Sequence, residues 1–116
     1  MRRAMHLADR GSGEGAVFDR VDWNQDHFVL SKGHSAGALY VSLWSQGRLG
    51  DSELAGFHRD GTWLGGHPSP KWRPEISFAT GSLGHGLGQA TGLALGLKIR
   101  GIAGHVYVLT SDGEWQ

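Results

Sequence analysis

Two short apolar runs in this chain have the character of β-strands. Residues 28–30 form a brief run that stops at residues 31–33, which predicts a short buried strand leading into a glycine turn. Residues 106–109 form an almost continuous apolar run, typical of a buried parallel strand. This second run leads to residues 110–114 at its carboxyl end, the edge at which open α/β sheets bind ligands. We therefore predict an α/β fold, a parallel sheet with flanking helices, which is incomplete in this chain.

Helical spacing between the two runs predicts two helices. The first covers residues 35–46, with Ser35 placed to cap its start. Its apolar face consists of Ala36, Leu39, Tyr40, Leu43 and Trp44. The second covers residues 51–60, because Asp51 or Ser52 can accept hydrogen bonds from the first free backbone amides.

Glycine is the compositional outlier, with 20 of 116 residues. In a third predicted helix, residues 81–100, one ridge carries a glycine at every fourth position, namely Gly84, Gly88, Gly92 and Gly96. Each interior glycine costs a helix about 1 kcal/mol relative to alanine, which close packing or a ligand must offset. Packing against a neighbouring element is the favoured interpretation for Gly92 and Gly96. Gly81, Gly84 and Gly86, near the helix start, are better placed for a ligand.

Composition limits the kinds of partner. Eleven basic residues balance eleven acidic ones, so we expect neither nucleic acid nor a membrane as partner, but a small neutral or phosphorylated substrate. The absence of cysteine excludes a disulfide framework, a thiolate zinc site and a cysteine nucleophile. We expect an irregular segment over residues 1–25, a partial ligand-binding domain over residues 26–116, and a chain that continues beyond Gln116.

Asp112 is the strongest single candidate for chemistry. A carboxylate at the end of a buried strand, followed by Gly113, can hold a hard cation while the backbone approaches phosphate oxygens. The alternative, an ordinary turn capped by the aspartate, is equally compatible with the local sequence. One carboxylate would not complete a magnesium site, so further ligands would come from phosphate, water and other parts of the protein.

Two other features suggest a site without defining one. Residues 81–86 lead into a helix whose first amides favour an anion, yet they fit neither the dinucleotide fingerprint nor the P-loop. Four of the seven histidines stand beside glycine, and three of these, His34, His67 and His85, are candidates for proton transfer or hydrogen bonding, while His105 is interpreted as a structural or surface residue. A capping or packing role is the alternative for each of them.

Taken together, these stretches resemble the amino-terminal, thiamine-diphosphate-binding domain of the transketolase family, in its split form with two separate chains. The matching motifs are Phe-Val-Leu-Ser-Lys-Gly-His at 28–34, Gly-His-Pro at 66–68, Thr-Gly-Ser-Leu-Gly-His-Gly at 80–86 and Val-Leu-Thr-Ser-Asp-Gly-Glu at 108–114. They occur in the order that the family has. The asparagine that closes the family's magnesium motif and the second domain, which binds the aminopyrimidine, are absent from this chain.

The resemblance implies a role for each matching residue. His34 and His67 would be catalytic, facing the thiazolium and the donor ketose. Asp112 would hold Mg²⁺, and the backbone of Gly113 would approach the diphosphate. The residues implied to bind the cofactor are His34, Gly81, Ser82, Leu83, Asp112, Gly113 and Glu114.

The function implied by the resemblance is transfer of a two-carbon ketol unit from a ketose to an aldose, with thiamine diphosphate and Mg²⁺ as cofactors. We expect a cytoplasmic dimer or larger oligomer. In it, a C-terminal transketolase subunit or second chain supplies the pyrimidine-binding domain, and a sugar or sugar phosphate is the substrate. This chain alone is expected to be inactive. Two alternatives stay open: a deoxyxylulose-phosphate synthase-like or 2-oxo acid decarboxylating enzyme, and a non-catalytic remnant or assembly module.

Overall fold

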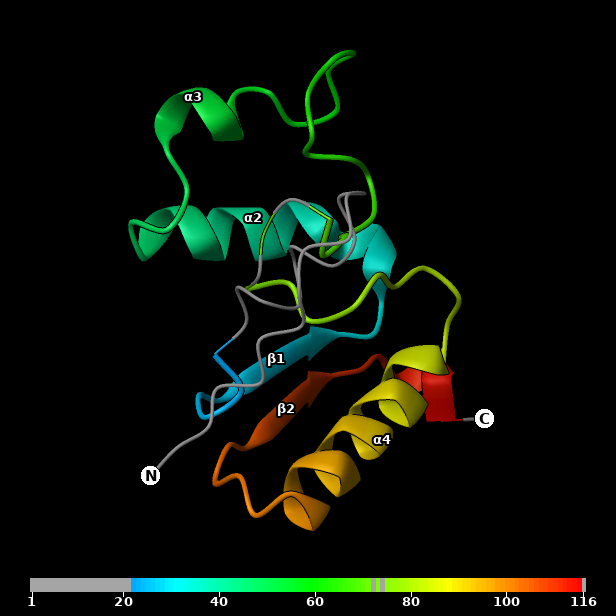
Figure 1. Ribbon diagram of the computed structural model, residues 1–116. Coiled ribbons are helices and arrows are strands. Elements are labelled where there is room, and N and C mark those ends of the chain that lie inside the picture. The colour runs from blue at the N-terminus through cyan, green and yellow to red at the C-terminus, as the bar shows by residue number, and fades with distance from the viewer. Residues whose placement is uncertain (1–21, 72, 74, 116) are drawn as a thin grey trace.

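The computed structural model describes residues 22–71, 73 and 75–115, so that most of the irregular segment predicted over residues 1–25 lies outside the described residues. Figure 1 shows a small sheet between two groups of helices. In chain order the elements are β1 (His27–Leu30), the 3₁₀ turn η1 (Gly33–Ser35), α2 (Ala36–Ser45), α3 (Asp51–Leu54), α4 (His85–Ile99), β2 (Val106–Leu109) and the 3₁₀ turn η2 (Asp112–Trp115).

The two strands pair in parallel, which confirms the predicted α/β fold. His27 lies opposite Val106, and Leu30 lies opposite Leu109. A parallel pair needs a crossover connection, and α4 lies in that connection and contacts both strands. No helix within the described part of the chain is long and apolar enough to cross a membrane.

The prediction that both strands are buried is wrong for one face of the sheet. Phe28, Tyr107 and Leu109 are 40%, 56% and 47% exposed. Side chains alternate between the two faces of a strand. Phe28 and its partner Tyr107 therefore lie on one face of the sheet, and Val29 and its partner Val108 lie on the other. Parallel sheets are normally covered on both faces, and the described residues cover this one only in part.

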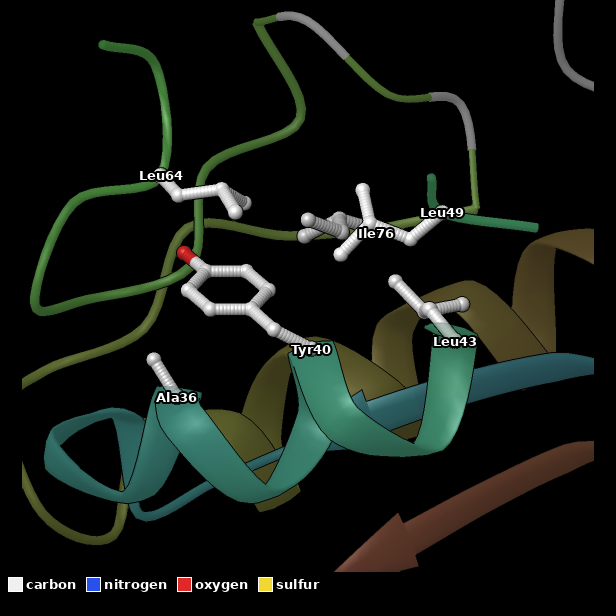
Figure 2. Packing of buried hydrophobic residues seen from close by; sticks show 6 residues of the cluster. All are labelled: Ala36, Tyr40, Leu43, Leu49, Leu64 and Ile76. Carbon is white, nitrogen blue, oxygen red and sulfur yellow. The ribbon is translucent and has the colours of Figure 1, made fainter. Parts of the chain in front are cut away.

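The hydrophobic core lies on one side of α2, as the helical spacing predicts (Figure 2). Ala36, Tyr40 and Leu43 are buried there against three residues from loops, Leu49, Leu64 and Ile76. Trp44, which the spacing places on this face, is 42% exposed. Its indole Nε1 donates to Asp51 Oδ1 at 2.6 Å, so the polar end of the ring finds its partner at the surface.

The start of α2 and the length of α3 differ from the predictions. Ser35 occupies the N-cap position of α2, but its side chain makes no capping hydrogen bond. The N-cap of α3 is Gly50 instead of Asp51 or Ser52, and Glu53 Oε2 accepts the Gly50 amide at 2.9 Å.

The predicted helix over residues 51–60 stops at Leu54. Beyond it the Thr62 hydroxyl donates to the carbonyl oxygens of Gly56 and Arg59, at 2.5 and 2.7 Å. His58 has a positive φ of 59°, which no α-helix accommodates. These contacts hold the segment in turns.

The glycine-rich helix also starts later than predicted, at His85 instead of Gly81, because Gly84 adopts a left-handed φ of 81°. The expected packing of Gly92 and Gly96 is wrong for the described residues, since a Cβ built at either would meet nothing within 4 Å. The close contact is at Gly86, whose Cβ would lie 2.5 Å from Ser31 Oγ and 2.6 Å from Ser31 Cα. Gly86 therefore sets how closely α4 approaches β1.

Candidate functional site

The carboxyl ends of β1 and β2 lie side by side and carry the predicted motifs. β1 continues into Ser31, whose amide donates to the Leu109 carbonyl at 2.9 Å, so the strands stay paired to the last residue. β2 continues into η2, and Figure 1 shows η2 beside the first turn of α4. Three segments distant in the sequence thus meet at one edge of the sheet.

The turn after β1 packs on the segment that leads to α4. Thr80 Oγ1 donates to the Leu30 carbonyl at 2.6 Å in a buried hydrogen bond. A Cβ at Gly33 would fall 2.5 Å from the Thr80 carbonyl carbon and 2.8 Å from the Gly81 nitrogen. Only glycine permits this contact, which places Gly33, in the turn that carries His34, against Thr80 and Gly81.

His67 reaches the same region from a different loop. A Cβ built on Gly81 would lie 3.1 Å from His67 Cδ2, so the imidazole packs on the Gly81 backbone. The loop is held by Tyr40, whose hydroxyl donates to the Gly65 carbonyl at 3.0 Å and lies 3.4 Å from the His67 carbonyl. His67 itself is exposed and available to a ligand.

Four of the residues predicted to bind the cofactor lie along the same edge and are exposed. His34, Gly81 and Ser82 are exposed, and Leu83 is 54% exposed. His85, the first residue of α4, is exposed as well. The structure thus brings the three segments that carry His34, His67 and His85 near one surface.

Glu114 is the most highly connected side chain of this edge. Its Oε1 accepts from Ser31 Oγ at 2.5 Å and from the Gly84 amide at 3.0 Å. Its Oε2 accepts from the Ser111 amide at 2.6 Å and from Ser111 Oγ at 3.0 Å. These hydrogen bonds, the one from Ser31 first, lower the pKa of Glu114 from 4.5 to about 2. An internal carboxylate therefore already uses one of the amides that the sequence predicted for an anion.

Asp112 and Gly113 lie in the turn that Glu114 closes, and both are exposed. A Cβ built on Gly113 would meet nothing within 4 Å, so a phosphate group has room to approach this backbone. Within residues 22–71, 73 and 75–115, no cluster of three or more His, Cys, Asp or Glu residues could hold a metal ion. Asp112 fits Mg²⁺ as one oxygen ligand, and the diphosphate, water and other parts of the protein would supply the remaining ligands.

A cavity of about 560 Å³ lies elsewhere, between α2 and the sheet, and none of the predicted site residues lines it. His27 lines this cavity and is 5% exposed, with Nε2 buried and without a hydrogen-bond partner. The motifs, not the cavity, mark the candidate site.

Sequence reasoning missed the residues that assemble this edge. Gly33 and Gly86 allow two segments to pack closely, and Tyr40 holds a loop by its hydroxyl. Ser31 donates a hydrogen bond to Glu114, which lies 83 residues later in the sequence. Ser31, Gly33 and Gly86 lie inside matched motifs, which were the available signal. For Tyr40 the helical pattern predicted burial but gave no indication of the hydrogen bond from its hydroxyl.

The glycine turns and the start of α4 lie at the carboxyl edge of a parallel sheet, the edge at which open α/β folds bind ligands. Residues 18–114 match the sequence profile of a family described as transketolase, thiamine diphosphate binding domain. The chain belongs to the transketolase family and contains part of that domain.

Individual relatives agree with this assignment. One of the subunits of apulose-4-phosphate transketolase from Actinobacillus succinogenes is 38% identical over 96 residues, covering 83% of this chain and 35% of that protein. The protein of the same name from Phocaeicola vulgatus is 40% identical over 90 residues, covering 78% of this chain and 32% of that protein. Human transketolase is 45% identical over 92 residues, covering 78% of this chain and 15% of that protein. The chain thus spans about a third of the length of the two bacterial relatives.

Proposed function

We propose that this chain contributes the diphosphate side of the active site in a transketolase-like enzyme. The enzyme would transfer a two-carbon ketol unit from a ketose to an aldose with thiamine diphosphate and Mg²⁺. The observation that carries the proposal is the meeting of the His34, Gly81 and Asp112 motifs at the carboxyl edge of a parallel sheet. Family membership supplies the cofactor class, because the matched domain is one that binds thiamine diphosphate.

In this proposal the exposed histidines act on the sugar side. His34 and His67 donate or accept hydrogen bonds at the donor ketose and steady the charge that develops when its carbon–carbon bond breaks. The contact between His67 and Gly81, and that between Gly33 and Thr80, support this pairing because they bring the His67 imidazole and the turn that carries His34 to one region. Thiamine diphosphate, when bound, supplies the electron sink for cleavage beside the ketose carbonyl.

The diphosphate and its metal would be held by the other side of the edge. Gly81, Ser82 and Leu83 line the cofactor in this proposal. Asp112 provides one oxygen to Mg²⁺, and the open backbone at Gly113 approaches the diphosphate. Glu114 belongs to the same site in this proposal.

A partner chain is part of the proposal. Two relatives are each named as a subunit of a transketolase, and this chain spans about a third of the length of each. We propose that a second chain supplies the pyrimidine-binding domain in a cytoplasmic dimer or larger assembly, and that this chain is inactive alone. The relatives' names point to a sugar phosphate as the substrate class.

Calorimetric titration with thiamine diphosphate in the presence of Mg²⁺ tests the proposal. It would be carried out on the chain alone and on the chain mixed with the C-terminal subunit of a split transketolase. We expect Asp112→Asn to weaken the Mg²⁺-dependent binding by more than about tenfold, because it alters an oxygen ligand of the metal. Asp60→Asn, at an exposed aspartate outside the site, is the matched control and should bind like the unmodified chain.

Two results would contradict the proposal. The first is the absence of thiamine diphosphate binding both alone and with the partner, which would favour a non-catalytic assembly module. The second is unchanged binding in Asp112→Asn, which would remove the aspartate from the metal site.

A further inference from the structure

We propose that Glu114 is a positioning residue, whose carboxylate ties the ends of β1 and β2 to the start of α4 and so sets where Asp112 and Gly113 lie. The inference rests on the proposed function, because it concerns the turn assigned to Mg²⁺ and the diphosphate. It changes the role of Glu114 from direct contact with the cofactor to support of the residues that make this contact.

The hydrogen bonds that the Glu114 carboxylate already accepts favour a positioning role over direct contact with the cofactor or its metal. An ionised carboxylate has about four acceptor positions, two on each oxygen. Glu114 Oε1 accepts hydrogen bonds from Ser31 Oγ at 2.5 Å and from the Gly84 amide at 3.0 Å. Glu114 Oε2 takes the amide and the hydroxyl of Ser111, at 2.6 and 3.0 Å. With these four donors in place, neither oxygen is left to bind a metal ion.

The donors on the sheet and helix are themselves held in place. Ser31 has no exposed surface, and its amide is paired with the Leu109 carbonyl at 2.9 Å. The backbone of α4 lies directly over it, because a Cβ at Gly86 would be 2.5 Å from Ser31 Oγ. Gly84 directs its amide to the carboxylate from a left-handed φ of 81°, next to the first helical residue. Glu114 therefore binds to a rigid frame.

The turn that carries Asp112 has little other support. Ser111 and Glu114 close it by the two Oε2 hydrogen bonds and by the Glu114 amide, which donates to the Ser111 carbonyl at 3.2 Å. Asp112 and Gly113 are the two residues inside this closed turn. The Trp115 indole also donates to Thr110 Oγ1 at 3.0 Å, but that bond stays within the same strand end. Within the described residues, the side-chain hydrogen bonds from this turn to β1 and α4 are those of Glu114.

The test compares Glu114→Gln with Glu53→Gln in the full chain. Glutamine keeps one carbonyl oxygen but replaces the other acceptor with an amide, which cannot take the backbone N–H of Ser111 or Gly84. Glu53 is a suitable control because it also accepts a backbone amide, that of Gly50, and pairs with Arg73 away from the site. Both substitutions remove one charged, hydrogen-bonded carboxylate.

The first measurement needs no ligand. Backbone ¹⁵N relaxation should show Gly113 becoming mobile on the picosecond to nanosecond timescale in Glu114→Gln, while the rest of the fold stays ordered. The amide protons of Gly84 and Ser111 should shift upfield as they lose their charged acceptor. If Gly113 is as rigid in Glu114→Gln as in the unmodified chain, the proposal is wrong.

The second measurement is the Mg²⁺-dependent affinity for thiamine diphosphate, with the partner subunit present. Loss of a group that orients a metal ligand costs about tenfold to a hundredfold in affinity, and we expect a decrease in this range for Glu114→Gln and none for Glu53→Gln. Ser31→Ala removes one donor only and should weaken binding less, which covers the case in which Glu114→Gln does not fold. Equal affinity in Glu114→Gln and the unmodified chain would overturn the inference. If the unmodified chain binds no cofactor, the proposed function fails, and the relaxation data still decide whether Glu114 holds the turn.

Discussion

Two glycines of α4 should respond to alanine in opposite directions. A methyl group at position 86 would lie 2.5 Å from Ser31 Oγ and 2.6 Å from Ser31 Cα, whereas one at position 92 meets nothing within 4 Å among the described residues. Ordinary contact begins at 3.4 Å, so Gly86→Ala must push the start of α4 away from β1 by almost 1 Å. The Ser31 backbone cannot yield, because its amide is paired with Leu109.

The magnitudes follow from two opposing effects. Replacing glycine by alanine within a helix raises the free energy of unfolding by about 0.5–1 kcal/mol in either variant. Overpacking costs about 1–3 kcal/mol, and only Gly86→Ala incurs it. The free energies of unfolding of the two variants should therefore differ by about 1–3 kcal/mol, with Gly92→Ala the more stable.

Thermal unfolding followed by circular dichroism measures this difference. One kcal/mol shifts the Tm of a domain of this size by roughly 4 °C or more, so the gap between the variants is measurable. Urea unfolding of the same samples tests whether the slope is unchanged, as a native-state effect requires. Gly86→Ala with a Tm equal to or above that of Gly92→Ala would refute the reasoning. It would mean that α4 does not lie against Ser31 as described.

Two further predictions concern Glu114 and Tyr40. The pKa of Glu114 is lowered from 4.5 to about 2 in the folded state, so its contribution to stability is complete above pH 4.5 and is lost as the pH falls toward 2. Acid titration of the unfolding free energy should show this loss in the unmodified chain and a smaller one in Glu114→Gln; superimposable curves would contradict it. Tyr40→Phe removes the hydroxyl bonded to the Gly65 carbonyl and should cost about 0.5–1.5 kcal/mol in urea unfolding. It should also speed proteolytic cleavage in the loop of His67; an unchanged cleavage rate would show that Tyr40 does not hold that loop.

Local patterns predicted the elements that depend on local chemistry. The apolar run at 28–30 became β1, and the buried positions Ala36, Tyr40 and Leu43 followed from helical spacing. The boundaries were less accurate. Helix α3 ends at Leu54, well short of the predicted end, because the Thr62 hydroxyl and a positive φ at His58 stabilise turns. Neither the hydrogen bond nor the backbone conformation of His58 can be read from a hydrophobic pattern.

The glycines show where local reasoning ends. A four-residue spacing marked Gly92 and Gly96 as packing positions, yet both are open in the described structure. Gly86, outside that ridge, carries the close contact. Which glycine meets a neighbour depends on how α4 is rotated and shifted against β1, and helical periodicity contains no information about this docking.

The sequence by itself determined the family, the order of the motifs and the residue types available for cofactor and sugar, because these are properties of short segments. Tertiary structure alone decided how the segments meet. The pairing of β1 with β2 brings Ser31 within 2.5 Å of Glu114 across 83 residues, and Gly33 brings the turn after β1 against Thr80. Such contacts depend on strand register and helix docking. The energy that selects them comes from burial and hydrogen bonds between distant segments, which no single segment contains.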